Sequence, residues 1–394
     1  MLPALILRIK SLPLQIARVA VICAVLLFCP SDLSFVPTDR PAVVNPQQPA
    51  EDVGERPSTP PAGPQGLARQ PLSHRAARVE GLTLGSQAVL EGLWTPQELQ
   101  GSPHDTQLVR LRGPDHTPPA WQVPTQVAPP LAPGWRGSIR RVQPWHNQKV
   151  IALTFDLCER ADDVTGYDAP IVHYLRTEQV RATFFAGGKW MRSHAEKAMQ
   201  LMADPLFEVG NHSWTHGNLR VLQGEDLARQ ILWTQAQYEL LWDELEHRAR
   251  RLGIAPQEME KIPRRPLAFR FPYGTCSPEA LQALAASGLP AIQWDVVSGD
   301  PARHQTAPSI VKTVLSQTRA GSIVVFHANG RGHGTADALP RIIPALRAQG
   351  FEFVTVSELL RLGRVITAEE CYELRPGDNR RYDAMVGEGT SRWR

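Results

Sequence analysis

The chain has 394 residues, with 42 Lys and Arg against 39 Asp and Glu, and its formal net charge is +3. Such a small charge gives no argument for nucleic-acid binding, and the aromatic residues are not interleaved with basic clusters as in single-strand binders. The 35 prolines are concentrated before position 145. This distribution predicts one large domain behind a poorly structured leader rather than two average domains.

The N-terminal segment has the pattern of an export signal. Arg8, Lys10 and Arg18 occur without any acidic residue, and an apolar run over residues 19–29 follows. We therefore interpret residues 1–30 as a signal peptide or membrane anchor, and expect an exported protein that is periplasmic, extracellular or anchored facing the envelope. The run is shorter than the roughly 20 apolar residues of a spanning helix, and no clear cleavage site follows it, so both forms stay open.

Composition divides the rest of the chain. Residues 31–145 are rich in Pro, Gln, Gly and Ala and are interpreted mainly as a linker, with possible short strands at 88–93 and 107–111. Part of this segment could instead fold back onto the domain as an added strand. Residues 146–363 form the predicted catalytic domain, and residues 364–394 a polar C-terminal extension. Nothing in the sequence specifies an oligomeric state.

Within the predicted catalytic domain, short β-branched or aromatic runs alternate with longer amphipathic stretches. This alternation predicts an α/β fold, a parallel sheet with both faces covered by helices, either open or closed into a barrel. The predicted strands are residues 150–155, 182–186, 207–210, 268–271, 291–297, 322–326 and 351–356, and the predicted helices are 169–176, 195–202, 225–251, 278–287, 307–318 and 336–349.

Polar residues with catalytic potential stand near the ends of several predicted strands. Asp156, His212, Arg270 and His327 each lie within a few residues of such an end. In parallel α/β folds, reacting groups lie just beyond the carboxyl ends of the strands, where the loops converge. We therefore expect these four side chains to share one site.

His212 and His216 form a His-x-x-x-His pair, which brings two imidazoles to the same side of one helical turn. Such a pair suits Zn²⁺, Co²⁺ or Ni²⁺, with one further protein ligand and open positions for water and substrate. Ordinary surface or core histidines are the alternative. The position directly after an apolar strand favours the metal site.

The remaining candidates suit acid–base chemistry. Asp156 could take a proton from a metal-bound water, and Arg270 could hold that carboxylate. The backbone N–H of Tyr273 could face a developing oxyanion. His327 could protonate a leaving nitrogen, with Asp300 as its hydrogen-bond partner. A purely structural Arg–Asp pair and a structural strand-end histidine are the competing interpretations.

These segments, in this order, resemble the motifs of the polysaccharide deacetylase family, carbohydrate esterase family four. The resemblance covers roughly residues 148–360 and rests on Thr-Phe-Asp, His-Ser-x-x-x-His, Arg-x-Pro-Tyr-Gly, a later Asp and an apolar strand ending in His. It implies a distorted, TIM-barrel-like (β/α) barrel with about seven parallel strands. It also implies metal-dependent removal of N-acetyl groups from N-acetylglucosamine residues of peptidoglycan, chitin-like oligomers or exopolysaccharides, with release of acetate.

The resemblance assigns the same roles to these residues. Asp156 is the implied base, His212 and His216 are metal ligands, Arg270 holds the base, Tyr273 is the oxyanion donor, and Asp300 supports the acid His327.

The chain departs from the family pattern at Leu157, where the family has a second Asp that completes the metal site. We expect Glu159 to serve as the third ligand, ahead of Asp162, Asp163 or a water. A weakened metal site would instead leave a glycan-binding envelope protein without turnover. An amidohydrolase of a small C–N substrate is a further alternative, which the export signal disfavours.

Three cysteines lie outside the signal-like segment, namely Cys158, Cys276 and Cys371, so at least one is unpaired. If the motif loops converge as the resemblance implies, Cys158 and Cys276 could form a disulfide in an oxidising compartment. We favour this disulfide. The alternative is that a thiolate supplies the missing metal ligand, which Zn²⁺ accepts.

Overall fold

The computed structural model describes residues 82–386. The predicted signal segment and the first part of the predicted linker lie outside these residues. Within the described part of the chain, no helix is both long enough and apolar enough to cross a membrane.

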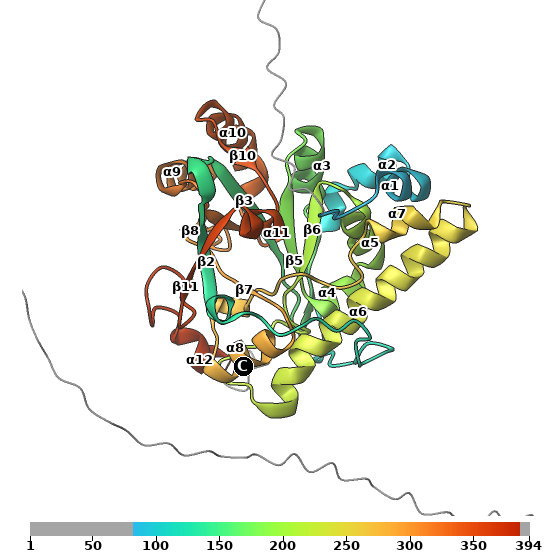
Figure 1. Cartoon of the computed structure of the whole chain (residues 1–394), viewed down its shortest axis with the longest axis horizontal. Coiled ribbons are helices and arrows are strands. Elements are labelled where there is room, and N and C mark those ends of the chain that lie inside the picture. Colours follow the sequence, from blue (N-terminus) through green and yellow to red (C-terminus); the bar gives the residue numbers. More distant parts are fainter. Residues whose placement is uncertain (1–81, 387–394) are drawn as a thin grey trace, which may run out of the picture. The chain divides into compact units, whose positions relative to one another are not determined.

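A parallel sheet forms the centre of the molecule (Figure 1). Its strands pair in the order β6-β5-β3-β9-β8, and each of these pairs is parallel. A short strand, β10, pairs in parallel with the beginning of β3. The strands are β3 (Val150–Leu157), β5 (Ala182–Ala186), β6 (Phe207–Asn211), β8 (Val296–Val297), β9 (Ile323–His327) and β10 (Glu352–Phe353).

Isolated β-bridges of single residues connect this sheet to a second group of strands. Phe269 bridges in parallel to both Asn211 and Ala291, and so links β6 to β7 (Ala291–Ile292). Strand β2 (Ser138–Pro144) pairs in parallel with β7 and antiparallel with β11 (Gly363–Ala368). The fold is therefore the predicted α/β architecture of a distorted (β/α) barrel, and the predicted strand at 268–271 is reduced to a bridge.

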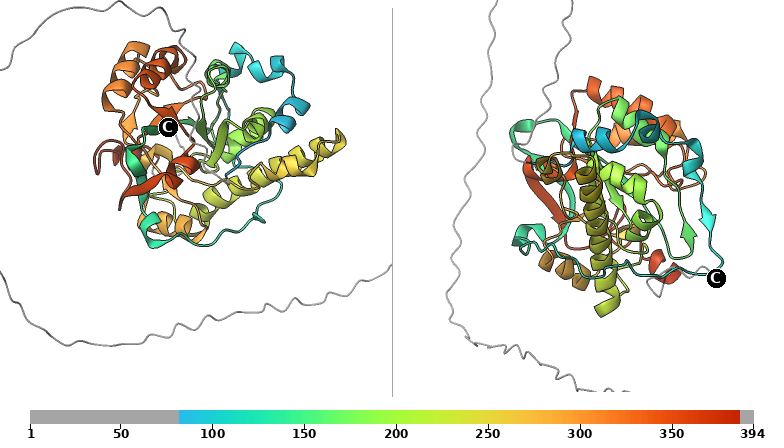
Figure 2. Two further views of the ribbon diagram at one scale, coloured as in Figure 1. Left: turned by 45° about the horizontal axis from the view of Figure 1, so that its top comes forward. Right: turned by 90° about the vertical axis from the view of Figure 1, so that its right-hand side faces the viewer.

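Helices follow the strands, as the alternating pattern predicts. The 28-residue α6 is the longest of the described helices, and it runs along the edge of the domain in the left-hand view of Figure 2. Acidic residues in its first turn and arginines in its last turn complement the helix dipole. The helices are α3 (Ala169–Thr177), α4 (Gly188–Ser193), α5 (Ala195–Ala203), α6 (Gly224–Arg251), α7 (Pro256–Glu260), α8 (Pro278–Ala286), α9 (Ala307–Gln317), α10 (Thr335–Ala348) and α11 (Val356–Arg361).

The central strand β3 separates two apolar cores. Alternate residues of a strand face opposite sides of the sheet. One set packs into the large core that includes helical side chains, whereas Val150 and Ala152 belong to a second core with side chains of β2, β7 and β9. Thr154 and Asp156 continue the second set by the same alternation. The first set is Ile151, Leu153, Phe155 and Leu157.

The linker interpretation is wrong for residues 82–144, which pack onto the barrel. Val89, Leu90 and Trp94 are buried in the large core. The helix that carries Val89 and Leu90 is capped by Ser86, and the helix that follows Trp94 is capped by Thr95. The suggested strand at 88–93 is helical, whereas 107–111 does contain a strand. The elements are α1 (Gln87–Leu93), α2 (Pro96–Gln100), η1 (Pro103–Thr106), β1 (Val109–Arg110), β4 (Asp163–Val164), which pairs with β1, η2 (Pro133–Trp135) and η3 (Trp145–Asn147).

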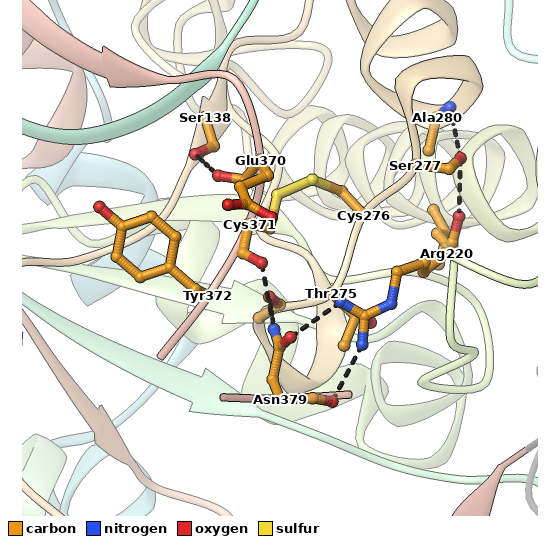
Figure 3. The surroundings of a disulfide bond; sticks show 12 residues. Ser138, Arg220, Thr275, Cys276, Ser277, Ala280, Glu370, Cys371, Tyr372 and Asn379 are labelled. Atoms are coloured by element: carbon orange, nitrogen blue, oxygen red, sulfur yellow. Dashed lines mark hydrogen bonds between the residues drawn. A yellow bond between two sulfur atoms is a disulfide. The ribbon is translucent and has the colours of Figure 1, made fainter. Parts of the chain in front are cut away.

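The C-terminal extension is also more ordered than its polar sequence predicts. Strand β11 pairs with β2, and Cys371 forms a disulfide with Cys276 (Figure 3). The fully buried Asn379 donates to the Cys371 carbonyl, and its side-chain oxygen accepts from Arg220. A final helix, α12 (Arg381–Met385), follows. Residues 363–386, which we call the C-terminal segment, are thus attached to the barrel by a covalent bond and by buried hydrogen bonds.

Candidate active site

The strand register brings the predicted site residues to one edge of the sheet. Asp156 is paired with His327 on β9. On the other side of β3, Leu157 pairs with Ala186, which pairs with Asn211, the residue before His212. Parallel strands present their carboxyl ends at the same edge, so these side chains converge, as the sequence predicts.

Asp156 and Arg270 form a buried pair. One guanidinium nitrogen, Nη1, donates to Asp156 Oδ1 at 2.8 Å and to Thr154 Oγ1 at 2.7 Å. The other nitrogens donate to the carbonyls of Ile292 at 3.3 Å and Gln293 at 3.2 Å. Arg270 is fully buried, and burial of a guanidinium is costly unless it is paired and hydrogen-bonded. The pair therefore gives the Asp156 carboxylate one defined orientation.

The two histidines of the His-x-x-x-His pair lie beside this carboxylate. His212 Nδ1 lies 2.9 Å from the Arg270 carbonyl, which can only accept a hydrogen bond, so this nitrogen carries the proton. The opposite nitrogen, Nε2, is left with a lone pair 3.8 Å from Asp156 Oδ2. His216 Nδ1 is buried and has no hydrogen-bond partner in the described part of the chain. Metal-binding histidines typically use one nitrogen for the metal and the other for such a hydrogen bond.

Cys158 completes a cluster with the two histidines. Its Sγ lies 3.4 Å from His212 Nε2, and donor atoms of Cys158, His212 and His216 all lie within 4.8 Å of one another. Leu157, at the position of the family's second Asp, is fully buried in the large apolar core. One thiol and two imidazoles are a donor set that suits Zn²⁺. The cluster therefore fits the divalent ion that the sequence predicts.

The expectation that Glu159 is the third ligand is wrong in this structure. Glu159 Oε1 accepts from Lys189 Nζ at 2.7 Å and from Ser193 Oγ at 2.6 Å, and Oε2 accepts from the Thr165 backbone N–H at 3.0 Å. Glu159 and Lys189 are both fully buried. The carboxylate is held by this ion pair and does not reach the histidines. Asp163 pairs instead with Arg160 and Arg331.

The expected disulfide between Cys158 and Cys276 is also wrong. Cys276 pairs with Cys371 of the C-terminal segment, 95 residues away, and their Cα atoms are 5.4 Å apart. Cys158 is free and buried. The reason is the direction of β3, which turns Cys158 toward the histidines.

His327 and Asp300 are in contact, as predicted. Asp300 Oδ1 lies 2.8 Å from His327 Nδ1, and Oδ2 accepts from the His327 backbone N–H and from Thr335 Oγ1, both at 2.7 Å. Burial opposes protonation of the imidazole, but the Asp300 charge and hydrogen bond outweigh it and raise the pKa of His327 well above its ordinary value. His327 therefore has the environment of a proton donor.

Electrostatics also distinguishes the members of the cluster. Burial alone raises the pKa of the Cys158 thiol, but His216 and His212 outweigh this and hold its pKa well below the ordinary value. Burial lowers the pKa of His216. For His212 the nearby Asp156 and Cys158 outweigh burial and raise the pKa. The two imidazoles thus favour ionisation of the thiol, whereas burial opposes it.

Tyr273 lies beside the cluster in the short turn η4 (Pro272–Gly274). Its ring contacts that of His216, with centroids 4.5 Å apart, and its hydroxyl is buried without a partner in the described residues. Burial raises the pKa of this hydroxyl. Tyr273, His216 and Ser213 all have positive φ angles, between 55° and 66°. Such left-handed non-glycine residues are strained and cluster at functional sites.

A cavity of about 220 Å³ opens over these groups. Asp156, Cys158, His216, Tyr273 and His327 line it, as does Asp300. Sequence reasoning missed several other lining residues, because they come from loops or from the C-terminal segment and match no motif. These are Arg160, Trp294, Arg331, Glu373 and Tyr382.

Comparisons with known proteins identify the family to which the chain is similar. The model of the family described as polysaccharide deacetylase matches residues 145–292. A peptidoglycan-N-acetylglucosamine deacetylase of Bacillus cereus is 30% identical over 220 residues, covering 55% of this chain and 90% of that protein. The peptidoglycan-N-acetylmuramic acid deacetylase PdaC of Bacillus subtilis is 32% identical over 214 residues, covering 54% and 39%.

Among solved structures, a family 4 pseudoenzyme from Bacillus anthracis aligns with a TM-score of 0.46 and 25% identity, covering 58% of this chain and 70% of that one. The chain spans from 31% to 90% of the length of the first three curated relatives that it matches. The match to the B. cereus relative that is 30% identical covers 90% of that protein's length. The chain belongs to the polysaccharide deacetylase family, a family of hydrolases that act on carbon–nitrogen bonds other than peptide bonds.

Proposed function

We propose that the protein hydrolyses the N-acetyl group of N-acetylglucosamine residues in a polysaccharide and that the reaction depends on a divalent metal. One observation carries the proposal. Asp156 and His327, on neighbouring strands, line the same cavity as Cys158 and His216. A proton acceptor, a proton donor and a set of metal donors are the groups that metal-assisted amide hydrolysis requires.

Cys158, His212 and His216 would hold the metal, for which Zn²⁺ is our first choice and Co²⁺ or Ni²⁺ the alternatives. When bound, such an ion polarises the amide carbonyl and lowers the pKa of a water molecule. The orphaned Nδ1 of His216 and the lone pair on His212 Nε2 support this assignment.

The chain's own residues move the protons. Asp156 accepts the proton of the attacking water at Oδ2, because Oδ1 is engaged by Arg270. As the carbon–nitrogen bond breaks, His327 donates a proton from Nε2 to the departing amine, while Asp300 holds Nδ1. The backbone N–H of Tyr273 donates to the oxygen that gains negative charge. The products are acetate and a free amino sugar.

The substrate class follows from the relatives, which are named for N-acetylglucosamine and N-acetylmuramic acid units of peptidoglycan. We propose a polysaccharide with N-acetylglucosamine units, either peptidoglycan, a chitin-like oligomer or an exopolysaccharide. An envelope polymer is consistent with the predicted export signal at residues 1–30, and we propose that the protein acts outside the cytoplasm.

The test is acetate release by the full chain loaded with Zn²⁺, assayed on peptidoglycan and on N-acetylchitooligomers. We expect release that a chelator abolishes and that Asp156→Asn lowers by about 10²-fold or more, within the range of general-base loss. Glycan binding without release, unchanged by Asp156→Asn, would favour the silent glycan-binding protein. Turnover of small amides alone would favour the amidohydrolase.

A further inference from the structure

The free cysteine of the site has a definite orientation that follows from the strand before it. Side chains of a strand alternate, so residues 156 and 158 share a side while residue 157 takes the other. The structure follows this rule, because Leu157 is buried in the large core while Asp156 and Cys158 line the cavity. A ligand at 158 in place of 157 therefore requires no change in the register of β3.

The carboxylates around the site have other partners. Asp156 is paired with Arg270, and Asp300 is held by His327 and Thr335. Glu159 is in a buried ion pair with Lys189. Within residues 82–386, the group of three metal-ligating side chains whose donor atoms lie this close together is Cys158, His212 and His216.

Two independent observations point to a ligand at this cluster. First, His216 Nδ1 is buried and unpartnered within the described chain, a costly state for a polar atom unless something binds there. Second, the other two cysteines of the described chain are joined to each other, so Cys158 stays a free thiol in a domain that carries a disulfide elsewhere. A buried thiol that only donates a hydrogen bond to His212 would account for their 3.4 Å contact, but it would leave the His216 nitrogen without a partner in the described chain.

We propose that Cys158 is the third metal ligand, so that this protein has a Cys-His-His centre in place of a centre with a carboxylate. A thiolate carries the same single negative charge as the carboxylate that the family resemblance leads one to expect, and the net charge of the centre is conserved. The softer sulfur favours Zn²⁺ and Co²⁺ over Mg²⁺, Ca²⁺ and Mn²⁺, which prefer oxygen. The assignment deepens the proposed function and rests on it for the role of the metal, but binding can be measured without turnover.

The experiment is a titration of the full-length, metal-free protein with Co²⁺, followed by absorption spectroscopy. A thiolate bound to Co²⁺ gives a sulfur-to-metal charge-transfer band in the near ultraviolet, whereas nitrogen and oxygen ligands do not. We expect this band to saturate at one Co²⁺ per chain and to disappear when Zn²⁺ displaces the cobalt. Alkylation of Cys158 by iodoacetamide should slow markedly once the metal is bound.

Matched variants separate the role of the sulfur from the fold. Cys158→Asp supplies an oxygen ligand of the same charge, and we expect it to bind one Co²⁺ without the band. Cys158→Ala removes the ligand, and we expect affinity to fall by about 100-fold or more, at least as much as the loss of a supporting residue. Far-ultraviolet circular dichroism and thermal melts of both variants establish that they are folded.

Three results would overturn the proposal. The parent could bind one Co²⁺ without the band, the band could survive in Cys158→Ala, or mass spectrometry could trap an acetyl thioester on Cys158. The last would mean that the sulfur attacks the substrate as a nucleophile beside His327. Acetate release is measured separately, so a band without turnover counts against the proposed function alone, and turnover without a band counts against the ligand alone.

Discussion

Loss of the guanidinium of Arg270 should destabilise the protein strongly. Arg270→Met keeps most of the aliphatic volume but removes the donors to Asp156, Thr154 and two backbone carbonyls. The Asp156 side chain is only 6% exposed, so its charge would be left buried without the guanidinium that pairs with it. Breaking such a buried pair typically costs about 3–5 kcal/mol.

Urea denaturation in the presence of a chelator measures this cost without any contribution from bound metal. We expect Arg270→Met to lower the free energy of unfolding by about 3–5 kcal/mol, and Asp156→Asn in the same background to recover part of the loss, because the uncompensated charge is gone. Arg229→Met is the matched control, since Arg229 is 43% exposed in its surface pairs and should change stability by less than about 0.5 kcal/mol. A loss under about 1 kcal/mol for Arg270→Met, with no recovery in the double variant, would refute the reasoning.

Three further predictions concern buried charge and the disulfide. Glu159→Gln should cost about 3–5 kcal/mol in urea denaturation, because the fully buried Lys189 loses its partner. The Glu159→Gln variant should bind as many metal ions per chain as the parent. Loss of the bound metal in this variant would indicate that Glu159 is a metal ligand after all. Asp168→Asn should flatten the pH dependence of stability between about pH 4 and 6. Burial raises the Asp168 pKa from 3.8 to about 6. Protonated Asp168 therefore makes its full contribution to the parent's unfolding free energy below pH 4, and up to about 3 kcal/mol of it is lost as pH rises through 6. Equal slopes for parent and variant in melts across this window would contradict it. Replacing Cys276 and Cys371 by Ser should lower the unfolding free energy by about 4.7 kcal/mol, as for a loop of this length. The double substitution should also raise KM more than it lowers kcat, because the C-terminal segment lines the cavity. An unchanged KM would contradict a role of the C-terminal segment in substrate binding.

The local sequence by itself determined which segments form strands and helices and where the chemistry lies along the chain. Apolar runs ending in Asp156 and His327 predict strands with polar ends, and parallel strands bring such ends together, so the convergence of the site followed from the pattern alone. The helix predicted at 225–251 is α6, at 224–251 in the structure. Alternation from Asp156 was also a local signal for Cys158, because residues two apart share a side of a strand.

Pairings between distant residues were decided by tertiary structure. The partner of Glu159 is Lys189 and that of Cys276 is Cys371. No spacing rule selects these partners, since each choice depends on how segments 30 and 95 residues apart meet. The packing of residues 82–144 onto the barrel could not be predicted for the same reason. The few apolar side chains of this proline-rich segment are buried only by contact with the barrel. Sequence therefore specified the strand-end acid–base groups, and the three-dimensional fold decided which side chain stands opposite the two histidines.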